Sequence, residues 1–414
     1  MSETIHADIC VVGAGPVGGT LACRLAAAGV STVVVDRAPL PPMEHPAFDG
    51  RAYAIAVASQ RVIAAAGIWD RLPLSETGAG PCPIAEIRVS DGRLGRPASR
   101  LFLHFDHREA TGPDEEAGPF GWMVEARDLR VAINASLHAQ PNVRVFAPVE
   151  AQIERRVDGA FVHIAGGPTI ACRLVVAADG KASALRTQAG IPVTRLPYRQ
   201  TGIVCAIAHD MPHHNVALEH FLPAGPFARL PMRGIAGAPH VSAIVWTERD
   251  RDAPRLLALD DAAFARQIAR RMGDHLGDVR LLGRRWHYPL GAQHAHRYFG
   301  ARLALIGDAA HTIHPIAGQG LNLGFRDVGE LARLLIAARD TGADPGGPEL
   351  LLRYQRARRP DNMVMLAATD ALDRLFSTDF PPMRLVRDLG LGAVQRLPRL
   401  KRMFMRQAMG LGGS

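Results

Sequence analysis

A glycine-rich segment near the N-terminus, set between two short apolar runs, constrains the fold of this chain more than any other feature. The first run, residues 8–12, is followed directly by residues 13–18 (GAGPVG). An alanine-rich stretch of helical character then ends at Gly29, and a second apolar run, Thr32–Val35, is followed by Asp36. Short apolar runs bounded by glycine are typical of buried parallel strands. The segment therefore predicts strand, turn, helix and strand, the opening of a doubly wound α/β domain.

Each part of this segment has a physical role in binding a dinucleotide. Gly13 permits a tight turn, Gly15 lets the backbone approach a pyrophosphate, and Gly18 lets the helix pack closely on the strand. The helix N-terminus then faces the anion, and Asp36 is placed to bind the adenosine ribose. The motif by itself leaves FAD and NAD open. The residues assigned to dinucleotide binding on this basis are Gly13, Gly15, Pro16, Val17, Gly18, Asp36 and Arg37.

The overall composition describes a globular chain of about two to three domains. Its 414 residues are 48% hydrophobic, and neither an internal repeat nor a low-complexity tract occurs. The five cysteines are far apart and never spaced as C-x-x-C, which argues against a disulfide framework and a structural zinc site. No apolar run approaches the ~18 residues of a membrane span, and no signal-peptide pattern precedes the first strand. We therefore expect a cytoplasmic protein.

Two later segments favour a flavin over a nicotinamide dinucleotide. Residues 174–180 (LVVAADG) read as a buried strand that ends in an Asp-Gly turn, and residues 303–311 (LALIGDAAH) repeat that design. The second segment continues into residues 312–324, where three glycines permit close approach of the backbone to a ligand. A helix that opens near Leu321 would direct free N–H groups at an acceptor. A reduced flavin ring carries negative charge at such an edge.

With these three motifs in this order, the chain resembles the class A flavoprotein aromatic hydroxylases, and within them the hydroxylases of ubiquinone biosynthesis. The resemblance extends over about residues 8–411. It includes residues 49–55 (DGRAYAI), similar to the family's flavin-contacting arginine segment, and residues 221–228 (FLPAGPFA), similar to a strand and turn of its substrate domain. The chain departs from the family at Asp36, where glutamate is more common, and the shorter side chain should still reach a ribose.

The resemblance implies a Rossmann-like FAD-binding domain of the glutathione reductase and p-hydroxybenzoate hydroxylase type. An inserted β-sheet substrate domain and a C-terminal helical segment would complete the fold. The FAD-binding domain would be discontinuous and comprise residues 1–75, 120–190 and 290–345. Residues 76–119 and 191–289 would form the substrate domain, and residues 346–414 the basic, amphipathic helical segment.

The family's functional residues carry over onto the matching positions. Besides the N-terminal residues, the flavin contacts implied are Arg51, Arg127, Asp179, Gly307, Asp308, Gly318, Gly320, Leu321 and Asn322. Pro315 would lie close to the flavin carbon that receives oxygen, and His314 and Tyr288 are further candidates for the catalytic site. Apolar character suggests a substrate cavity lined by Gly202, Phe221, Leu222, Pro226, Phe227, Trp246 and Tyr288. Two alternatives remain open: Arg51 and Arg127 could form ordinary surface ion pairs, and the apolar residues could simply belong to the protein core.

The activity implied by the resemblance is hydroxylation of the aromatic ring of a polyprenylated phenol in ubiquinone biosynthesis. FAD would be the cofactor, NAD(P)H the electron donor and O2 the cosubstrate, with oxygen transferred from a C4a-hydroperoxyflavin. Two alternatives stay open: a hydroxylase of a small soluble aromatic acid, and a non-catalytic carrier or assembly protein for prenyl lipids. A flavin halogenase is disfavoured because the Trp-x-Trp-x-Ile-Pro motif is missing.

Histidine pairs in the sequence do not indicate a metal site. His213-His214 and His294-x-His296 lack companion ligands in a recognised pattern, so we expect exposed loop histidines and assign no metal. Neither a Ser-His-Asp arrangement nor an H-E-x-x-H motif is found. This fits a reaction in which the cofactor carries the chemistry.

Positive charge gathers near the C-terminus. The formal charge is +8 at pH 7, and residues 383–407 hold seven basic side chains against Asp388 alone. A final helix would place Leu400, Met403, Phe404, Gln407, Ala408 and Leu411 on one arc and Arg399, Arg402 and Arg406 on the opposite arc. Packing on the helix's own domain and docking on a membrane surface are both open.

A polyprenylated substrate has to be taken from a bilayer, which favours peripheral association with the inner membrane. A biosynthetic complex or a homo-oligomer could use the same surface. Nucleic acid is not expected as a partner, because the basic residues are not interleaved with aromatic ones.

Overall fold

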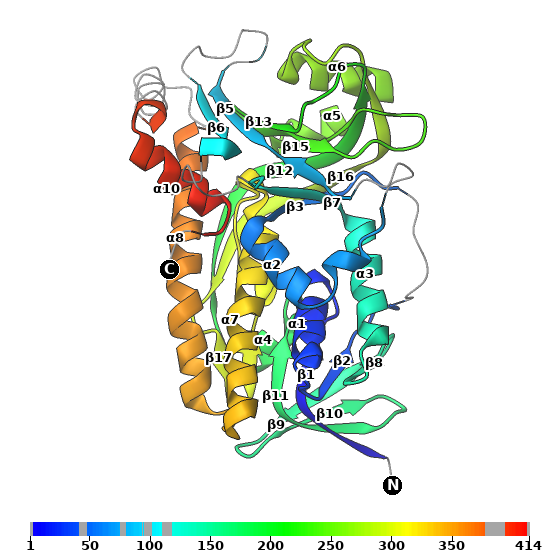
Figure 1. Cartoon of the computed structure of the whole chain (residues 1–414), viewed down its shortest axis with the longest axis vertical. Coiled ribbons are helices and arrows are strands. Elements are labelled where there is room, and N and C mark those ends of the chain that lie inside the picture. The colour runs from blue at the N-terminus through cyan, green and yellow to red at the C-terminus, as the bar shows by residue number, and fades with distance from the viewer. Residues whose placement is uncertain are drawn as a thin grey trace.

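The structure is a computed structural model that describes residues 3–40, 48–74, 80–92, 94, 102–109, 118–376 and 394–411. Within these residues the chain forms two eight-stranded sheets and one sheet of three strands (Figure 1). In this view the first sheet lies toward the lower end of the molecule, near the N-terminus, and the second lies toward the upper end. The expected α/β architecture with a second, β-rich domain is confirmed.

The first sheet has a parallel centre in the order β17-β18-β11-β1-β2-β8, and the β9-β10 hairpin is attached to β11. Its central strands are apolar on both faces; every residue of β2, for example, is buried. Continuous apolar strands of this kind occur where helices cover a parallel sheet. The strands are β1 (Thr4–Val12), β2 (Thr32–Val35), β8 (Val143–Phe146), β9 (Ala151–Arg155), β10 (Ala160–Ile164), β11 (Thr169–Ala177), β17 (Phe299–Gly300) and β18 (Leu303–Leu305).

Helix α1 lies between α3 and α7, and all three pack along the first sheet (Figure 1). α1 has proline at its first position and ends two residues before Gly29, whose positive φ of 80° closes the helix. Leu21, Leu25 and the neighbouring small side chains bury its inner face. The helices are α1 (Pro16–Ala27), α3 (Ala126–Ala139), α4 (Ala184–Gln188) and α7 (Gln319–Thr341).

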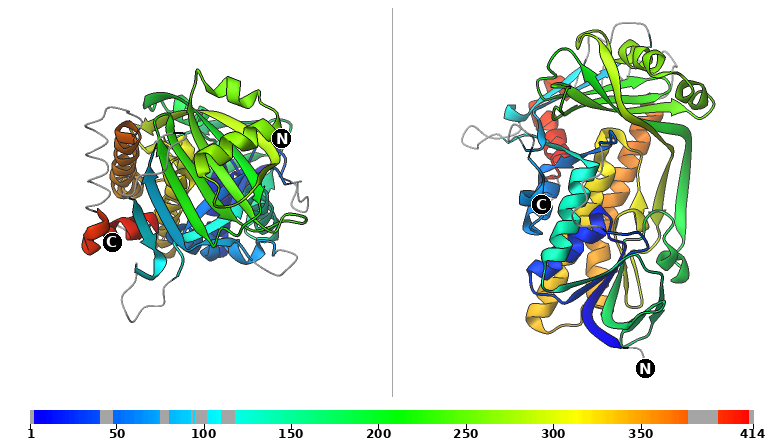
Figure 2. Two further views of the ribbon diagram at one scale, coloured as in Figure 1. Left: turned by 90° about the horizontal axis from the view of Figure 1, so that it is seen from above. Right: turned by 90° about the vertical axis from the view of Figure 1, so that its right-hand side faces the viewer.

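The second sheet has the order β19-β16-β12-β15-β14-β13-β5-β6. Helices α5 (Ala253–Leu257) and α6 (Asp261–Met272) lie on its outer side, as Figure 2 shows. Asp260 caps α6 by accepting a hydrogen bond from the Ala263 N–H, and Phe264 and Ile268 bury its inner face. The strands are β5 (Glu86–Asp91), β6 (Leu103–Asp106), β12 (Val193–His209), β13 (Val216–Leu222), β14 (Gly225–Met232), β15 (Val241–Arg249), β16 (Val279–Ala295) and β19 (His311–Thr312).

Two long strands connect the regions of the molecule. β12 and β16 are each 17 residues long and run along one side of it from the second sheet toward the first (Figure 2). The domain boundary expected at residue 290 falls inside β16, because this strand continues unbroken to Ala295.

A small sheet in the order β3-β7-β4 lies between the large ones. Its strands are β3 (Ala52–Ala56), β4 (Cys82–Ile84) and β7 (Gly121–Glu125). Helix α2 (Val57–Ala65) follows β3 directly, so the segment expected to contact flavin runs from the small sheet into this helix. The short 3-10 turns are η1 (Trp69–Arg71), η2 (His107–Glu109), η3 (Gly307–Ala309) and η4 (Ile316–Gly318).

The C-terminal part is helical, as expected, in α8 (Pro348–Phe376) and α10 (Pro398–Ala408). Neither predicted arc of the last helix is its packing face: Lys401 and Met405 are buried, whereas Met403 and Phe404 are exposed. Lys401 can be buried because its ammonium pairs with Glu109 at 2.6 Å while its aliphatic stem is covered. Arg384 and Arg387 of the basic segment lie outside the described residues. None of the described helices has the length and apolar character needed to cross a bilayer.

Candidate dinucleotide-binding and active site

The glycine motifs meet at the carboxyl edge of the first sheet, where β1, β2 and β11 end side by side in parallel. A Cβ on Gly13 would lie 2.3 Å from the backbone oxygen of Ala178, and one on Gly18 would lie 2.0 Å from the backbone oxygen of Gly13. A Cβ on Gly15 would meet no heavy atom within 4 Å. Two glycines therefore let backbones pack against one another, and Gly15 leaves its backbone open to a ligand.

A helix N-terminus faces this opening. No side chain caps the first turn of α1, so its N–H groups are free to bind an anion. Asp36 follows β2, and its Oδ2 accepts a hydrogen bond of 2.6 Å from the Ala14 N–H, which anchors the carboxylate beside the turn. The cleft at this edge has a volume of about 1150 Å³. Residues that line it include Gly13, Gly15, Asp36, Arg37, Asp179 and Gly180.

The Gly-Asp turn of η3 lies directly against α1. A Cβ on Gly307 would lie 3.2 Å from a methyl group of Val17, and one on Gly324 of α7 would lie 2.6 Å from it. This close packing brings Asp308 beside the start of α1. The Asp308 side chain is accessible to solvent yet surrounded by protein, and the resulting desolvation raises the pKa of its carboxyl, opposed by His311. An acid in such a position can hydrogen-bond a polyol chain.

The start of α7 presents a second set of free backbone donors. α7 follows Gly318, which has a φ of 63° that favours glycine, and no side chain caps its first turn. Asn322 fixes this turn to β3, because its Oδ1 accepts from the Ala56 N–H at 2.9 Å and its Nδ2 donates to a β3 carbonyl at 2.8 Å. A Cβ on Gly320 would meet no heavy atom within 4 Å. The N–H groups around Gly320 and Leu321 therefore border open space, as expected for the edge of a flavin ring.

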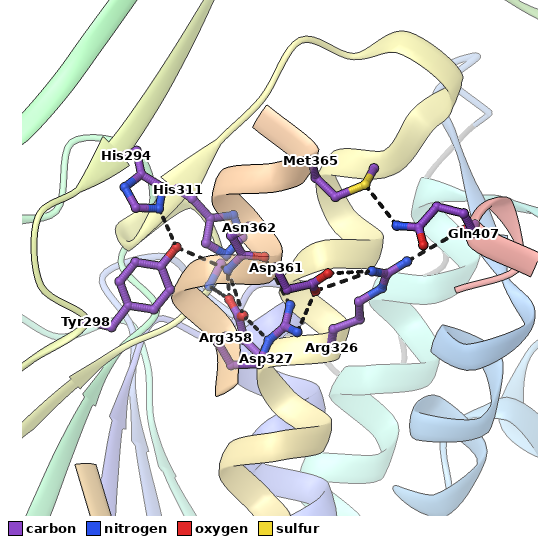
Figure 3. Close-up of polar contacts among 11 residues, drawn as sticks. His294, Tyr298, His311, Arg326, Asp327, Arg358, Asp361, Asn362, Met365 and Gln407 are labelled. Carbon is purple, nitrogen blue, oxygen red and sulfur yellow. Dashed lines mark hydrogen bonds and ion pairs between the residues drawn. The ribbon is translucent and has the colours of Figure 1, made fainter. Parts of the chain in front are cut away.

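A buried network that the sequence analysis missed holds the Gly-Asp turn in place (Figure 3). Asp327 of α7 is fully buried and accepts hydrogen bonds from the Gly307 N–H at 3.0 Å, His311 Nε2 at 2.6 Å and Arg358 Nε at 2.9 Å. Burial alone would raise the pKa of Asp327, but His311 and Arg358 lower it to about 2. The signal in the sequence was an acid on the apolar face of a long helix, one residue before Val328.

The same network corrects the expectation for His294, which is buried rather than exposed. Its Nε2 lies 3.0 Å from the hydroxyl of Tyr298, which also accepts a hydrogen bond from Asn362. His296 is exposed, because it lies one residue beyond the end of β16. Among the described residues, no group of three histidine, cysteine or acidic side chains could hold a metal ion.

Arg51 and Arg127 both have ion-pair partners. Arg51 Nη2 lies 2.7 Å from Asp49 Oδ2, and its guanidinium lies 4.3 Å from the centroid of the Trp286 ring. Arg127 Nε lies 2.7 Å from Glu125 Oε2. The pair of Arg51, whose side chain is 42% exposed, matches the alternative of a surface ion pair, whereas the pair of Arg127 with Glu125 is largely buried. A role of either arginine in binding flavin stays a prediction.

Tyr288 of β16 lies near the flavin-contacting segment. Tyr288 is 43% exposed, and in the sheet register it lies opposite Gly202 of β12. Burial raises the pKa of the neighbouring Tyr53 hydroxyl, and Arg51, Tyr288 and Asp308 are all close enough to act on it. The fold therefore gathers three predicted site residues around one tyrosine of β3.

The segment before α7 connects the two large sheets. His314 is fully buried, its Nε2 lies 3.2 Å from Gln200 Oε1 of β12, and its Nδ1 has no hydrogen-bond partner. Burial lowers the pKa of His314, so its ring is neutral near pH 7. Ile316 packs with Phe221 of the second sheet. Pro315 lies between these two residues and is thereby held at the junction.

The predicted substrate-contacting residues divide between the two faces of the second sheet. Phe221 packs with Ile316 on the face toward the first sheet. Gly202 lies on that face too, because it is paired with Thr247, next to outward-facing Trp246. Leu222, Phe227 and Trp246 instead belong to the core under α6, together with Phe264 and Ile268. The structure does not bring these three side chains to the face that looks toward the flavin motifs.

The residues at this edge fit an FAD molecule. A buried oxygen of Asp179, Oδ1, has no hydrogen-bond partner, and it lies at the cleft that contains Gly15. One uncapped helix N-terminus borders the cleft, and a second, that of α7, borders the space beside β3. The first suits a pyrophosphate, and the second suits a ring that becomes anionic on reduction.

Comparison with known proteins identifies relatives along the whole chain. A family model described as an FAD binding domain matches residues 6–369. The ubiquinone hydroxylase UbiL of Rhodospirillum rubrum is 50% identical over 405 residues, which cover 98% of this chain and 90% of that protein. The 3-demethoxyubiquinol 3-hydroxylase of Escherichia coli is 33% identical over 406 residues, 98% of both proteins.

Solved structures share the fold. PqsL, a probable FAD-dependent monooxygenase from Pseudomonas aeruginosa, superposes with a TM-score of 0.74 at 24% identity and covers 93% of this chain and 99% of its own. The p-nitrophenol 4-monooxygenase PnpA from Pseudomonas putida gives a TM-score of 0.76 at 20% identity, with 99% of both chains covered.

Proposed function

Because this chain belongs to the family of FAD-dependent aromatic hydroxylases that includes the ubiquinone hydroxylases, we propose that it hydroxylates the ring of a polyprenylated phenol. Its cofactor is FAD and its oxidant O2, and NAD(P)H is the donor typical of the family. One observation carries the proposal: the free N-terminus of α7 lies where the apolar face of the second sheet meets η4. An apolar aromatic substrate fits that junction.

FAD supplies the chemistry of oxygen transfer, and the chain supplies binding and orientation. In the bound state Asp36 would accept hydrogen bonds from the adenosine ribose, the first turn of α1 would bind the pyrophosphate, and Asp308 would bind the ribityl hydroxyls. The first turn of α7 directs N–H groups at the ring edge that becomes negative on reduction. The second sheet covers the reacting face and excludes water.

The test begins with the absorbance spectrum of the purified protein, followed by NADPH oxidation with and without a polyprenylphenol, with product scored by mass. We expect bound flavin and hydroxylated product that depends on the prenyl tail. Equal turnover of a small soluble aromatic acid would favour that class of substrate instead. Protein that stays colourless after reconstitution with FAD would favour a carrier role and contradict the proposal.

We further propose that α8 and α10 dock on the inner membrane, from which the substrate is taken. On α10, Met403 is 56% and Phe404 44% exposed, next to exposed arginines. α10 contacts α8 where Gln407 Nε2 lies 3.2 Å from Met365 Sδ. Apolar side chains joined to basic ones are typical of interfacial docking. The exposed apolar positions of this part of α8 are Met363, Val364, Ala367, Ala368, Ala371 and Leu372.

Flotation with liposomes of increasing anionic lipid content tests this docking. We expect binding to rise with anionic lipid, to weaken at high salt, and to be lost in the double variant Met403→Ser, Phe404→Ser. Val157→Ser removes an apolar side chain of the β9-β10 hairpin that is more exposed, at 92%, and this variant should bind as the wild type does. If the Met403→Ser, Phe404→Ser variant bound liposomes as well as the wild type, the proposal would be contradicted. A biosynthetic complex or a homo-oligomer would then be favoured as the partner of this surface.

A further inference from the structure

An acid lies buried on the inner face of the second sheet without a partner. Glu219 of β13 is 8% exposed, and no hydrogen bond or ion pair joins it to any described residue. Side chains alternate between the faces of a strand, and Leu218 and Leu222 pack in the core under α6. Glu219 therefore shares the opposite face with Phe221, toward the flavin motifs.

The surroundings of Glu219 are apolar. Its neighbours across the adjacent strands are Ala228 of β14 and Val89 of β5. Along its own strand and face lie Phe221, which packs with Ile316 of η4, and Ala217, whose cluster includes Ala54 of β3. Ile316 and Ala54 belong to the two segments that border the expected flavin ring. Glu219 is thus the acid placed between them on this face of β13.

Such a placement is unfavourable for the fold itself. Burial raises the pKa of Glu219 to about 7, and no charged side chain among the described residues offsets the effect. Other acids of the same sheet have cations: Glu248 pairs with Arg271 at 3.3 Å, and Glu86 pairs with Arg88 at 3.1 Å. A buried polar group without a partner calls for an explanation, and a ligand that supplies the partner is one.

We infer that Glu219 is the polar anchor of the aromatic head group: its carboxyl oxygen accepts a hydrogen bond from the ring hydroxyl of the phenol. The inference rests on the proposed function and deepens it. The apolar neighbours contact the ring and tail, and the single hydrogen bond sets how the ring is rotated in the site. Glu219 thereby determines which ring carbon faces the flavin and which phenols are accepted.

The test compares a short-chain prenylphenol with its methyl ether, which has lost the hydroxyl donor. Affinities are measured from the change in the flavin absorbance spectrum of the holoenzyme, which needs no turnover. We expect the wild type to prefer the phenol by about tenfold or more. Glu219→Leu should bind both compounds alike, and Glu219→Gln, which keeps an acceptor, should keep part of the preference. Glu86→Gln, on the same sheet, should keep the wild-type ratio.

Thermal unfolding shows that the comparison is made on folded protein. Because Glu219→Leu removes an unpartnered buried acid, we expect its Tm to equal or exceed that of the wild type. A wild-type preference that survives in Glu219→Leu, with hydroxylation intact, would overturn the inference and leave the proposed function standing. A preference that Glu219→Leu abolishes, when the wild type itself makes no hydroxylated product, would support the anchor and contradict the proposed function.

Discussion

Replacing Asp327 by asparagine tests whether the buried network holds the flavin-binding turn. The substitution keeps the size of the side chain and removes its charge. Arg358 keeps a partner in Asp361, at 2.6 Å, but loses the carboxylate at 2.9 Å, and the Gly307 N–H loses a charged acceptor at 3.0 Å. Since Gly307 precedes Asp308, the change acts on the flavin site through the backbone of η3.

The magnitude follows from the shifted pKa of Asp327. Its value falls from 3.8 to about 2 on folding. At ~1.36 kcal/mol per pH unit, the ionised carboxylate contributes about 2.5 kcal/mol to stability. Removing one partner of a buried pair costs roughly 3–5 kcal/mol, and the remaining contact of Arg358 with Asp361 places this case at the lower end. We expect a loss of about 3 kcal/mol near pH 7, which for a chain of 414 residues is a fall in Tm of roughly 3–4 °C.

The sign of the pH dependence follows as well. An acid whose pKa is lowered by folding contributes fully above the unfolded value of 3.8 and loses that contribution as the pH falls through about 2. The difference between wild type and Asp327→Asn should therefore be complete at pH 7 and narrow below pH 3.8.

Scanning calorimetry at pH 7 and at a pH below 3.8 measures the change in stability, and ultrafiltration of the holoenzyme measures how much flavin is retained. Glu330→Gln is the matched control, because Glu330 lies on the same helix in a more exposed pair with Arg333 at 2.7 Å. Such a pair contributes roughly 0–1 kcal/mol. A Tm within 1 °C of the wild type in Asp327→Asn, together with unchanged flavin retention, would refute the reasoning.

Three further predictions use the same assays. Gly18→Ala should lower both Tm and flavin retention, because its Cβ would lie 2.0 Å from a backbone oxygen. Gly15→Ala places its Cβ with no heavy atom within 4 Å, so it should leave the Tm of the apoprotein unchanged and weaken FAD binding alone. Equal losses of Tm in the two variants would contradict this prediction. Phe264→Ala should cost about 3–5 kcal/mol in the core under α6 yet retain FAD, as absorbance of the purified variant will report. Glu219, with a pKa raised from 4.5 to about 7, should make wild-type stability fall by about 3 kcal/mol as the pH rises between those values. Denaturation at pH 5 and pH 8 should find no such slope in Glu219→Gln.

The parts of the fold that follow from local physics were predictable from sequence. A tight turn at Gly13, a close helix at Gly18 and an acid after a buried strand at Asp36 each depend on neighbours within a few residues, so their spacing carries the information. The uncapped start of α7 follows in the same way from the glycines around Gly318. These segments define the dinucleotide-binding edge before any distant contact is known.

The predictions for β13, β14 and α10 were wrong in part, because the sequence shows that such an element has two faces but does not show which part of the protein packs against each face. Alternation along β13 and β14 places Leu222 and Phe227 on one face, yet only the packing of α6 reveals that this face is turned away from the flavin motifs. The same limit applies to α10, where Lys401 is buried because Glu109 comes from a distant segment.

The sequence by itself determined the dinucleotide-binding edge, the order of the three flavin motifs and the family. Only the tertiary structure decided that Asp327 supports the Gly-Asp turn and that Glu219 lies unpartnered on the inner face of the second sheet. Both are single acids whose meaning depends on partners, or on their absence, across elements far apart in the chain. Electrostatic free energy depends on distance and burial in space, and neither quantity is written in the local order of residues.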